Sequence, residues 1–196
     1  RKKEWNVNKQ KQIYNPFLPL TEYIPDGEPH VFGDRVYLFG SHDRAGGDRY
    51  CMNDYVAYSA MTTNLKEWKY EGVIYRKDQD PRNADKSHCL WAPDVVRGRD
   101  GRYYLYYCLD TLPELGVAVC DTPAGEYRYL DLVRYKDGTP LGTRPTDYVQ
   151  FDPAVLVDDD GEVYLFSGNG PKHIKESYPP KYSQIIVLAQ DMITVK

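Results

Sequence analysis

The sequence lacks the features of several common protein classes. No apolar run approaches the ~18 residues of a membrane-spanning helix, and Cys51, Cys89, Cys108 and Cys120 form no CxxC pair. A disulfide scaffold is not expected in a chain of 196 residues. With 25 Lys and Arg against 29 Asp and Glu, the net charge of −4 argues against nucleic acid or an anionic membrane as partner.

Helical periodicity is almost absent, and strand-like segments take its place. Short apolar and aromatic runs alternate with Gly, Asp, Asn and Pro turns, which is typical of all-β proteins. Tyrosine, which favours strands and whose flat amphipathic ring suits sugars, occurs 19 times. Residues 1–14 are interpreted as an N-terminal lead, because they are mostly basic and polar and contain no apolar signal-peptide core.

Three segments of the chain have the same internal pattern of strand, Asp/Gly turn and strand. They are residues 28–43, 93–110 and 152–169. Their second strands contain matching leucines, namely Leu38, Leu105 and Leu165. A further pair of strand-like runs follows each segment, so each unit contains about four strands.

Sheets of four strands repeated in tandem predict a β-propeller. An irregular β-sandwich is the alternative, and it is disfavoured because both halves of the unit recur in order. Propellers close with about 4–8 blades, so three units predict part of a ring, and we expect the protein to continue beyond Lys196. The predicted partial propeller covers residues 15–196, with blades at about 24–80, 88–145 and 150–196.

An Asp beside a Pro lies just before the first strand of each unit. The three carboxylates belong to Asp26, Asp94 and Asp152. If these strands are innermost, the rotation that relates successive blades brings the carboxylates together at one mouth of the central channel. Clustered carboxylates raise at least one pKa and separate acid from base roles. The alternative is that each Asp caps a turn.

Aromatic residues accompany two of these aspartates. Trp91 lies three residues before Asp94, and Phe151 directly precedes Asp152. Aromatic rings beside carboxylates commonly hold the apolar face of a sugar, so Trp91, Asp94 and Phe151 are candidate substrate contacts. Packing between blades is the alternative for Trp91. His42, after the first unit's second strand, either lines the channel or forms structural hydrogen bonds.

Taken together, three motifs resemble glycoside hydrolase family 43. They are residues 24–30 (IPDGEPH), 91–95 (WAPDV) and 151–153 (FDP), and the resemblance extends from residue 15 to about residue 190. It implies a five-bladed β-propeller of inverting enzymes that remove arabinose, xylose or related residues from plant polysaccharides and oligosaccharides. The sequence departs from the family pattern at Gly27, where many members have Pro.

The resemblance also implies roles for individual residues. Asp26 matches the general base, Asp152 the aspartate that tunes the acid's pKa, and Trp91 an aromatic substrate contact. The family's general-acid Glu opens the fourth blade, so we expect it beyond Lys196. No cofactor is implied. A calcium ion, which some members hold through a His on a later blade, has no support here, and residues 158–161 (DDDG) lack EF-hand spacing and predict a β-turn.

The leading hypothesis is therefore an inverting glycosidase acting on arabinose- or xylose-containing glycans, with a carbohydrate as partner. The alternative from another class is a propeller that binds carbohydrate without catalysis. A propeller used only for protein contacts has no need of axial carboxylates and is disfavoured. The sequence indicates neither the compartment nor the oligomeric state.

Overall fold

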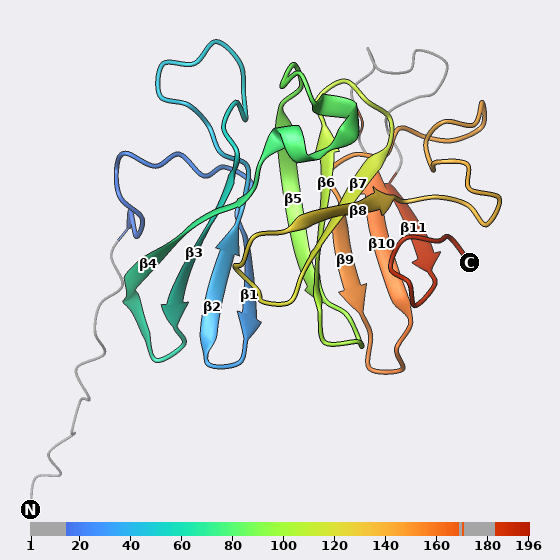
Figure 1. Cartoon of the computed structure of the whole chain (residues 1–196). Helices are drawn as coiled ribbons and strands as arrows, with labels where there is room; N and C mark the ends of the chain where they lie inside the picture. The colour runs from blue at the N-terminus through green and yellow to red at the C-terminus, as the bar shows by residue number, and fades with distance from the viewer. Residues whose placement is uncertain (1–14, 169, 171–182) are drawn as a thin grey trace, which may run out of the picture.

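The structure, a computed structural model, describes residues 15–168, 170 and 183–196, and the predicted lead at residues 1–14 lies outside them. The described chain consists of β-strands and two 3₁₀ turns, η1 (Lys77–Gln79) and η2 (Pro81–Asn83). Its strands form three antiparallel sheets that lie side by side (Figure 1). No helix in this part of the chain is long and apolar enough to cross a membrane.

Each sheet is built from strands that are consecutive in the sequence. The first contains β1 (Glu28–Phe32), β2 (Arg35–Phe39), β3 (Tyr55–Met61) and β4 (Asn64–Tyr75). The second contains β5 (Leu90–Arg97), β6 (Tyr103–Leu109), β7 (Leu115–Cys120) and β8 (Arg128–Leu132). The third contains β9 (Ala154–Val157), β10 (Val163–Gly168) and β11 (Ser183–Leu188). Four-stranded antiparallel sheets of this kind are the blades of propellers.

The matched leucines of the repeat occupy the same place in each sheet. Leu38, Leu105 and Leu165 lie in the middle of β2, β6 and β10, and all three are buried. The two-residue turn between β1 and β2 contains Gly33, whose φ of +65° lies in the left-handed region that glycine adopts most easily. The repeat seen in the sequence is thus a repeat of strand, tight turn and buried second strand.

The hydrophobic core lies between the sheets, and β6 supplies both of its main clusters. Leu105 and Tyr107 pack toward the first sheet with Phe39 and Tyr55. Tyr106, from the same strand, packs toward the third sheet in the other cluster. Because successive side chains of a strand point to opposite faces, β6 has both faces covered, and it is a nearly continuous buried run.

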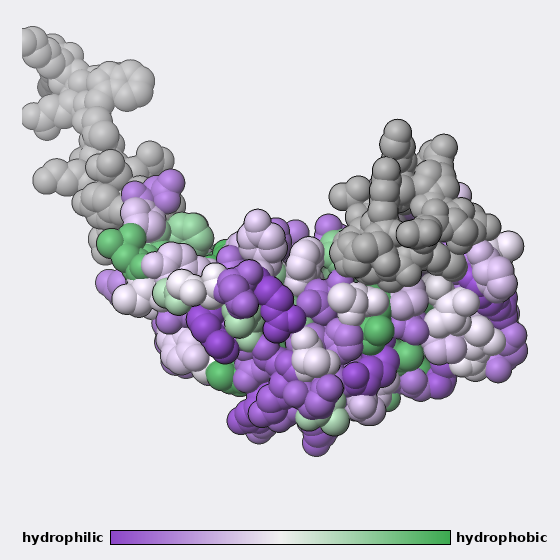
Figure 2. Space-filling model, turned by 90° about the horizontal axis from the view of Figure 1, so that it is seen from above, coloured by the Kyte–Doolittle hydropathy of each residue, from purple (hydrophilic) through white to green (hydrophobic). Residues whose placement is uncertain are grey.

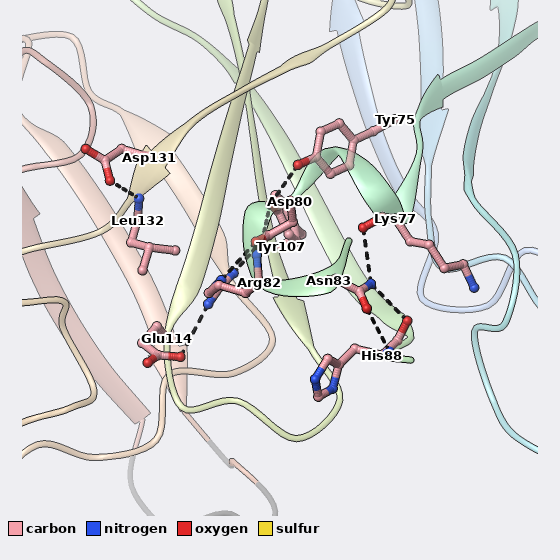
Figure 3. A network of polar contacts seen from close by, with 10 residues as sticks. All are labelled: Tyr75, Lys77, Asp80, Arg82, Asn83, His88, Tyr107, Glu114, Asp131 and Leu132. Carbon is pink, nitrogen blue, oxygen red and sulfur yellow. Dashed lines mark hydrogen bonds and ion pairs between the residues drawn. The ribbon is translucent and has the colours of Figure 1, made fainter. Parts of the chain in front are cut away.

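The link between the first and second sheets is held by a buried polar network (Figure 3). Asp80, fully buried, accepts hydrogen bonds from Arg82 Nη2 at 2.6 Å and from the Tyr107 hydroxyl at 2.6 Å. Tyr107 also contacts the hydroxyl of Tyr75 at 2.8 Å. Burial raises the pKa of Asp80, but its bonds to Arg82 and Tyr107 outweigh burial and hold that pKa below its usual value.

The first strands of the three sheets are neighbours, which decides where the site lies. β5 lies between β1 and β9, and these three strands begin at the same end of the molecule (Figure 1). The all-β class and the tandem sheets predicted from the sequence are confirmed, and residues 158–161 form the predicted turn, in which the Gly161 N–H donates to the Asp158 carbonyl oxygen at 2.8 Å.

Candidate active site

Asp26 and Asp152 lie at equivalent places on neighbouring first strands. Each precedes its strand by two residues, Asp26 before β1 and Asp152 before β9. Both adopt the left-handed backbone region, with φ of 54° and 45°. Asp tolerates this region better than most residues, and non-glycine residues held there cluster at active sites. The same turn thus presents both carboxyl groups at one end of the sheets.

The two carboxyl groups are electrostatically coupled. Partial burial, together with the negative charge of Asp26, raises the pKa of Asp152 to about 6. Asp152 therefore gains or loses its proton near pH 6. Two carboxyl groups of unequal proton affinity in one site can divide acid and base work between them.

Ser41 positions Asp26, although no sequence motif pointed to it. Its buried hydroxyl donates to Asp26 Oδ2 at 3.0 Å and accepts from the Ala92 N–H at 2.8 Å. The neighbouring Gly40 makes this approach possible, because a Cβ there would lie 2.8 Å from the Pro25 carbonyl oxygen. Ser41 thereby links the loop that carries Asp26 to the start of the second sheet.

Cys108 has the corresponding place in the second sheet. It follows Leu105 by three residues, as Ser41 follows Leu38. Its thiol donates to the Trp91 carbonyl oxygen at 3.8 Å. Complete burial raises the thiol pKa strongly, so Cys108 stays protonated and is not a nucleophile. The equivalent spacing from the leucine was the signal that could have identified both residues.

Asp94 is held differently from the other two aspartates. It is 3% exposed, and its carboxylate accepts from His30 Nε2 at 2.6 Å and from the Val155 N–H at 2.6 Å. His30 belongs to β1 and Val155 to β9, so one carboxylate joins all three sheets. These contacts favour a positioning role, and direct contact of Asp94 with a sugar stays a prediction.

The predicted aromatic contacts lie together beside Asp152. The rings of Trp91 and Phe151 are 5.4 Å apart at 63°, and the exposed ring of Tyr50 meets Trp91 edge-on at 6.2 Å. Phe151 is 4% exposed and backs Trp91 from the core side. Contact of Trp91 or Phe151 with substrate is untested and stays a prediction. Tyr50 was not identified from the sequence.

His42 contacts two segments that flank the first sheet. Its ring nitrogens lie 2.9 Å from the Asp54 carbonyl oxygen and 3.3 Å from Glu22 Oε2. Both contacts are to residues near the first sheet, and a contact of His42 with substrate remains a prediction. At Gly27, the departure from the family pattern, an added Cβ would lie 3.0 Å from Leu38 Cδ1, so the missing side chain leaves room for that leucine.

Within the described ranges, no group of three or more His, Cys, Asp or Glu side chains is arranged to hold a metal ion. The residues of this site offer carboxyl groups for proton transfer and charge stabilisation, beside aromatic side chains.

Comparisons with known proteins identify related sequences. The model of the glycosyl hydrolases family 43 matches residues 13–196. A xylosidase/arabinosidase from Thermoclostridium stercorarium is 56% identical over 186 residues, which are 95% of this chain and 38% of that protein. An arabinoxylan arabinofuranohydrolase from Paenibacillus polymyxa is 32% identical and matches 90% of this chain and 31% of its own length. The chain thus spans well under half of these relatives.

Solved structures give the same fold. A family 43 enzyme from Xanthomonas citri, complexed with xylose, superposes with a TM-score of 0.70 at 25% identity. The match covers 89% of this chain and 53% of that enzyme. A β-xylosidase/α-arabinofuranosidase from a compost microbial metagenome, complexed with xylotriose, has a TM-score of 0.64 at 27% identity and is covered to 57%. The three sheets therefore correspond to part of a β-propeller, and the alternative sandwich prediction is wrong.

Proposed function

This chain belongs to the glycosyl hydrolases family 43, and from that premise we propose that the protein hydrolyses glycosidic bonds in arabinose- or xylose-containing glycans with inversion at the anomeric carbon. The names of its relatives, xylosidase/arabinosidase and arabinoxylan arabinofuranohydrolase, support this substrate class. The complexes of its structural neighbours with xylose and xylotriose support a sugar as the ligand.

One observation carries the proposal. The turns before β1 and β9 hold Asp26 and Asp152 in the same left-handed conformation, and the charge of Asp26 contributes to the raised pKa of Asp152. A turn that only needed a cap would not require two coupled carboxyl groups at one end of neighbouring sheets.

In the proposed reaction, ionised Asp26 removes a proton from a water molecule beneath the anomeric carbon. That water attacks the carbon while an acid on the opposite face protonates the leaving oxygen. Inverting enzymes hold base and acid about 6.5–9.5 Å apart to admit the water. The hydrogen bond from Ser41 keeps Asp26 Oδ2 oriented, which leaves the other oxygen to accept from the water.

Asp152 has a supporting role in this scheme. Its carboxyl group titrates near pH 6, so at neutral pH it adds negative charge beside the acid and helps keep the pKa of that acid raised. No Glu among residues 1–196 matches the family's general acid, so the proposal takes that group from a part of the protein outside these residues. Trp91 offers its ring to the apolar face of the sugar.

The test is a matched pair of variants in the full-length gene product. Asp26→Asn keeps the size and the tolerance for positive φ, and we expect it to lower kcat on an aryl α-L-arabinofuranoside or aryl β-D-xyloside by about 10²–10⁴-fold while sugar binding persists. Asp34→Asn makes the same change in the turn at the far end of β1 and should leave kcat unchanged. Full activity of the Asp26→Asn protein would remove Asp26 from the base role. Sugar binding without turnover in the wild type would favour a carbohydrate-binding propeller.

A further inference from the structure

A pocket of about 350 Å³ lies beside the candidate active site, and its wall is strongly basic. Its volume is at the lower end of the range for small-molecule sites, about 300–1,000 Å³. Four cations and one carboxylate line it together with Met52 and Asn53; the charged residues are Arg44, Arg49, Lys77, Lys86 and Asp54. The chain as a whole has a net charge of −4, so this concentration of positive charge is local.

One wall of the pocket is the connection between β2 and β3, which is anchored at the candidate active site at both ends. At its start, Ser41 donates to Asp26. At its end, the Tyr55 hydroxyl donates to the Trp91 carbonyl oxygen at 2.6 Å. Between them, exposed Tyr50 contacts the Trp91 ring. The connection that lines the basic pocket therefore also contacts Asp26 and Trp91 of the candidate active site.

The other wall is the segment around η1 and η2, which is held by a buried network. Asn83, fully buried, donates to the carbonyl oxygens of Lys77 and His88 at 3.1 Å and accepts from the His88 N–H at 2.8 Å. In Figure 3 the side chain of Lys77 points away from this network. The Lys77 N–H donates to Asp54 Oδ1 at 2.9 Å, and this hydrogen bond joins the η1 segment to the connection between β2 and β3. The cations thus sit on a fixed backbone.

Two of the four cations are bound through neutral oxygens. Arg44 Nε donates to the amide oxygen of Asn53 at 3.3 Å, and Lys77 Nζ donates to the carbonyl oxygen of Met52. The other two face acidic groups outside the pocket lining, Lys86 at 2.9 Å from Asp78 and Arg49 at 4.0 Å from Asp110. Positive charge therefore remains for an anionic ligand, and guanidinium groups match the planar geometry of a carboxylate.

We propose that this pocket binds the carboxylate of a uronic-acid residue carried by the glycan, while the neighbouring part of the same glycan occupies the candidate active site. The inference rests on the proposed function, because the glycan that reaches Asp26 is what delivers the acid group. Hydrophilic side chains cover much of the molecular end that contains both sites (Figure 2). A sugar acid is favoured over a free anion, because the connection between β2 and β3 forms one wall of the pocket and is bound at its start to Asp26 through Ser41.

The test measures binding, so that it does not depend on turnover. Isothermal titration calorimetry of the full-length gene product with Asp26→Asn compares xylotriose with xylotriose that carries one glucuronic-acid branch. We expect the branched sugar to bind at least about tenfold more tightly, because hydrogen bonds to charged groups are stronger than neutral ones. Adding Arg44→Gln and Lys86→Gln should abolish this preference and leave xylotriose binding unchanged.

The matched control is Arg97→Gln, which removes an exposed cation at the opposite end of β5 and should preserve the preference. Equal affinity for the two sugars, or a preference that survives the double substitution, would overturn the proposal. Inorganic phosphate that binds as tightly as the branched sugar would also overturn it, since the pocket would then be a general anion site. If the wild type cleaves neither sugar but keeps the preference, the proposed function fails and the pocket assignment stands.

Discussion

The raised pKa of Asp152 predicts that Asp152→Asn makes the protein more stable at alkaline pH. In the folded protein the carboxyl titrates near pH 6, against an ordinary value of 3.8. Folding therefore disfavours the charged form. Below the unfolded-state pKa the carboxyl is neutral in both states and does not reduce the free energy of unfolding. As the pH rises through about 6, Asp152 ionises in the folded protein and the free energy of unfolding falls. Asn carries no charge at any pH, so the free energy of unfolding of the variant does not fall in this way.

The magnitude follows from the size of the shift. Each pKa unit corresponds to about 1.4 kcal/mol, so a rise of about two units would be worth about 3 kcal/mol for a fully shielded group. The Asp152 side chain is exposed, and solvent screening reduces this to about 1 kcal/mol. At pH 8, Asp152→Asn should raise the melting temperature by about 2–4 °C, and at pH 4 the difference should vanish.

Differential scanning calorimetry of wild type and variant at pH 4, 6 and 8 measures this directly. Because the charge of Asp26 contributes to the shift, the gain should be smaller when Asp26→Asn is already present. Asn also tolerates the φ of 45° at this position, so backbone strain does not mask the effect. A variant that is equally or less stable than wild type at pH 8 would refute the coupling of the two carboxyl groups.

Three further predictions concern the residues that hold the site. Ser41→Ala leaves the Ala92 N–H without its acceptor and should lower the free energy of unfolding by about 1–3 kcal/mol and kcat/KM by about tenfold, measured by urea unfolding and initial rates. Asp94→Ala removes a buried acceptor that joins three sheets and should cost about 3–5 kcal/mol in urea unfolding; a stable variant with only a raised KM would instead place Asp94 at the sugar. Asp80→Asn should cost about 3 kcal/mol at pH 7, and because the pKa of Asp80 is lowered, its deficit should shrink as the pH falls through that pKa, which a pH series of melting curves would detect.

The repeat made the fold predictable from the sequence. Matching leucines at similar distances from the acidic motifs predicted tandem sheets, because each leucine fills the same buried place on the second strand of its sheet. The sequence also placed Asp26, Asp94 and Asp152 just before the first strands, which holds for Asp26 and Asp152, while their roles at the site stay predictions. The strands, tight turns and buried leucines of each repeat unit depend on residues close together in the sequence, so a sequence pattern predicts them.

The buried position of Asp94 inside β5 was not predictable from the motif. The three aspartates looked equivalent, but Asp94 lies inside β5, whereas Asp26 and Asp152 precede their strands in left-handed turns. Within a strand its carboxylate reaches the N–H of Val155 on the neighbouring sheet, 61 residues away in the sequence. The motif does not encode which side of the strand boundary the residue occupies.

Long-range contacts also explain the other omissions. Ser41 matters because its hydroxyl meets Ala92, 51 residues later. The basic pocket combines a loop after β2 with the turns before β5, and its cations are dispersed among polar residues over residues 44–86. Such sites are assembled by the packing of neighbouring sheets, and only three-dimensional coordinates show them.

The configuration of the released sugar tests the central claim most directly. Proton NMR of the full-length gene product acting on an aryl α-L-arabinofuranoside and an aryl β-D-xyloside, recorded before mutarotation, identifies the first anomer formed. The account predicts the inverted anomer from at least one substrate, because Asp26 activates water for a single displacement. First release of the retained anomer would contradict it, since Asp26 would then act as a nucleophile or not at all.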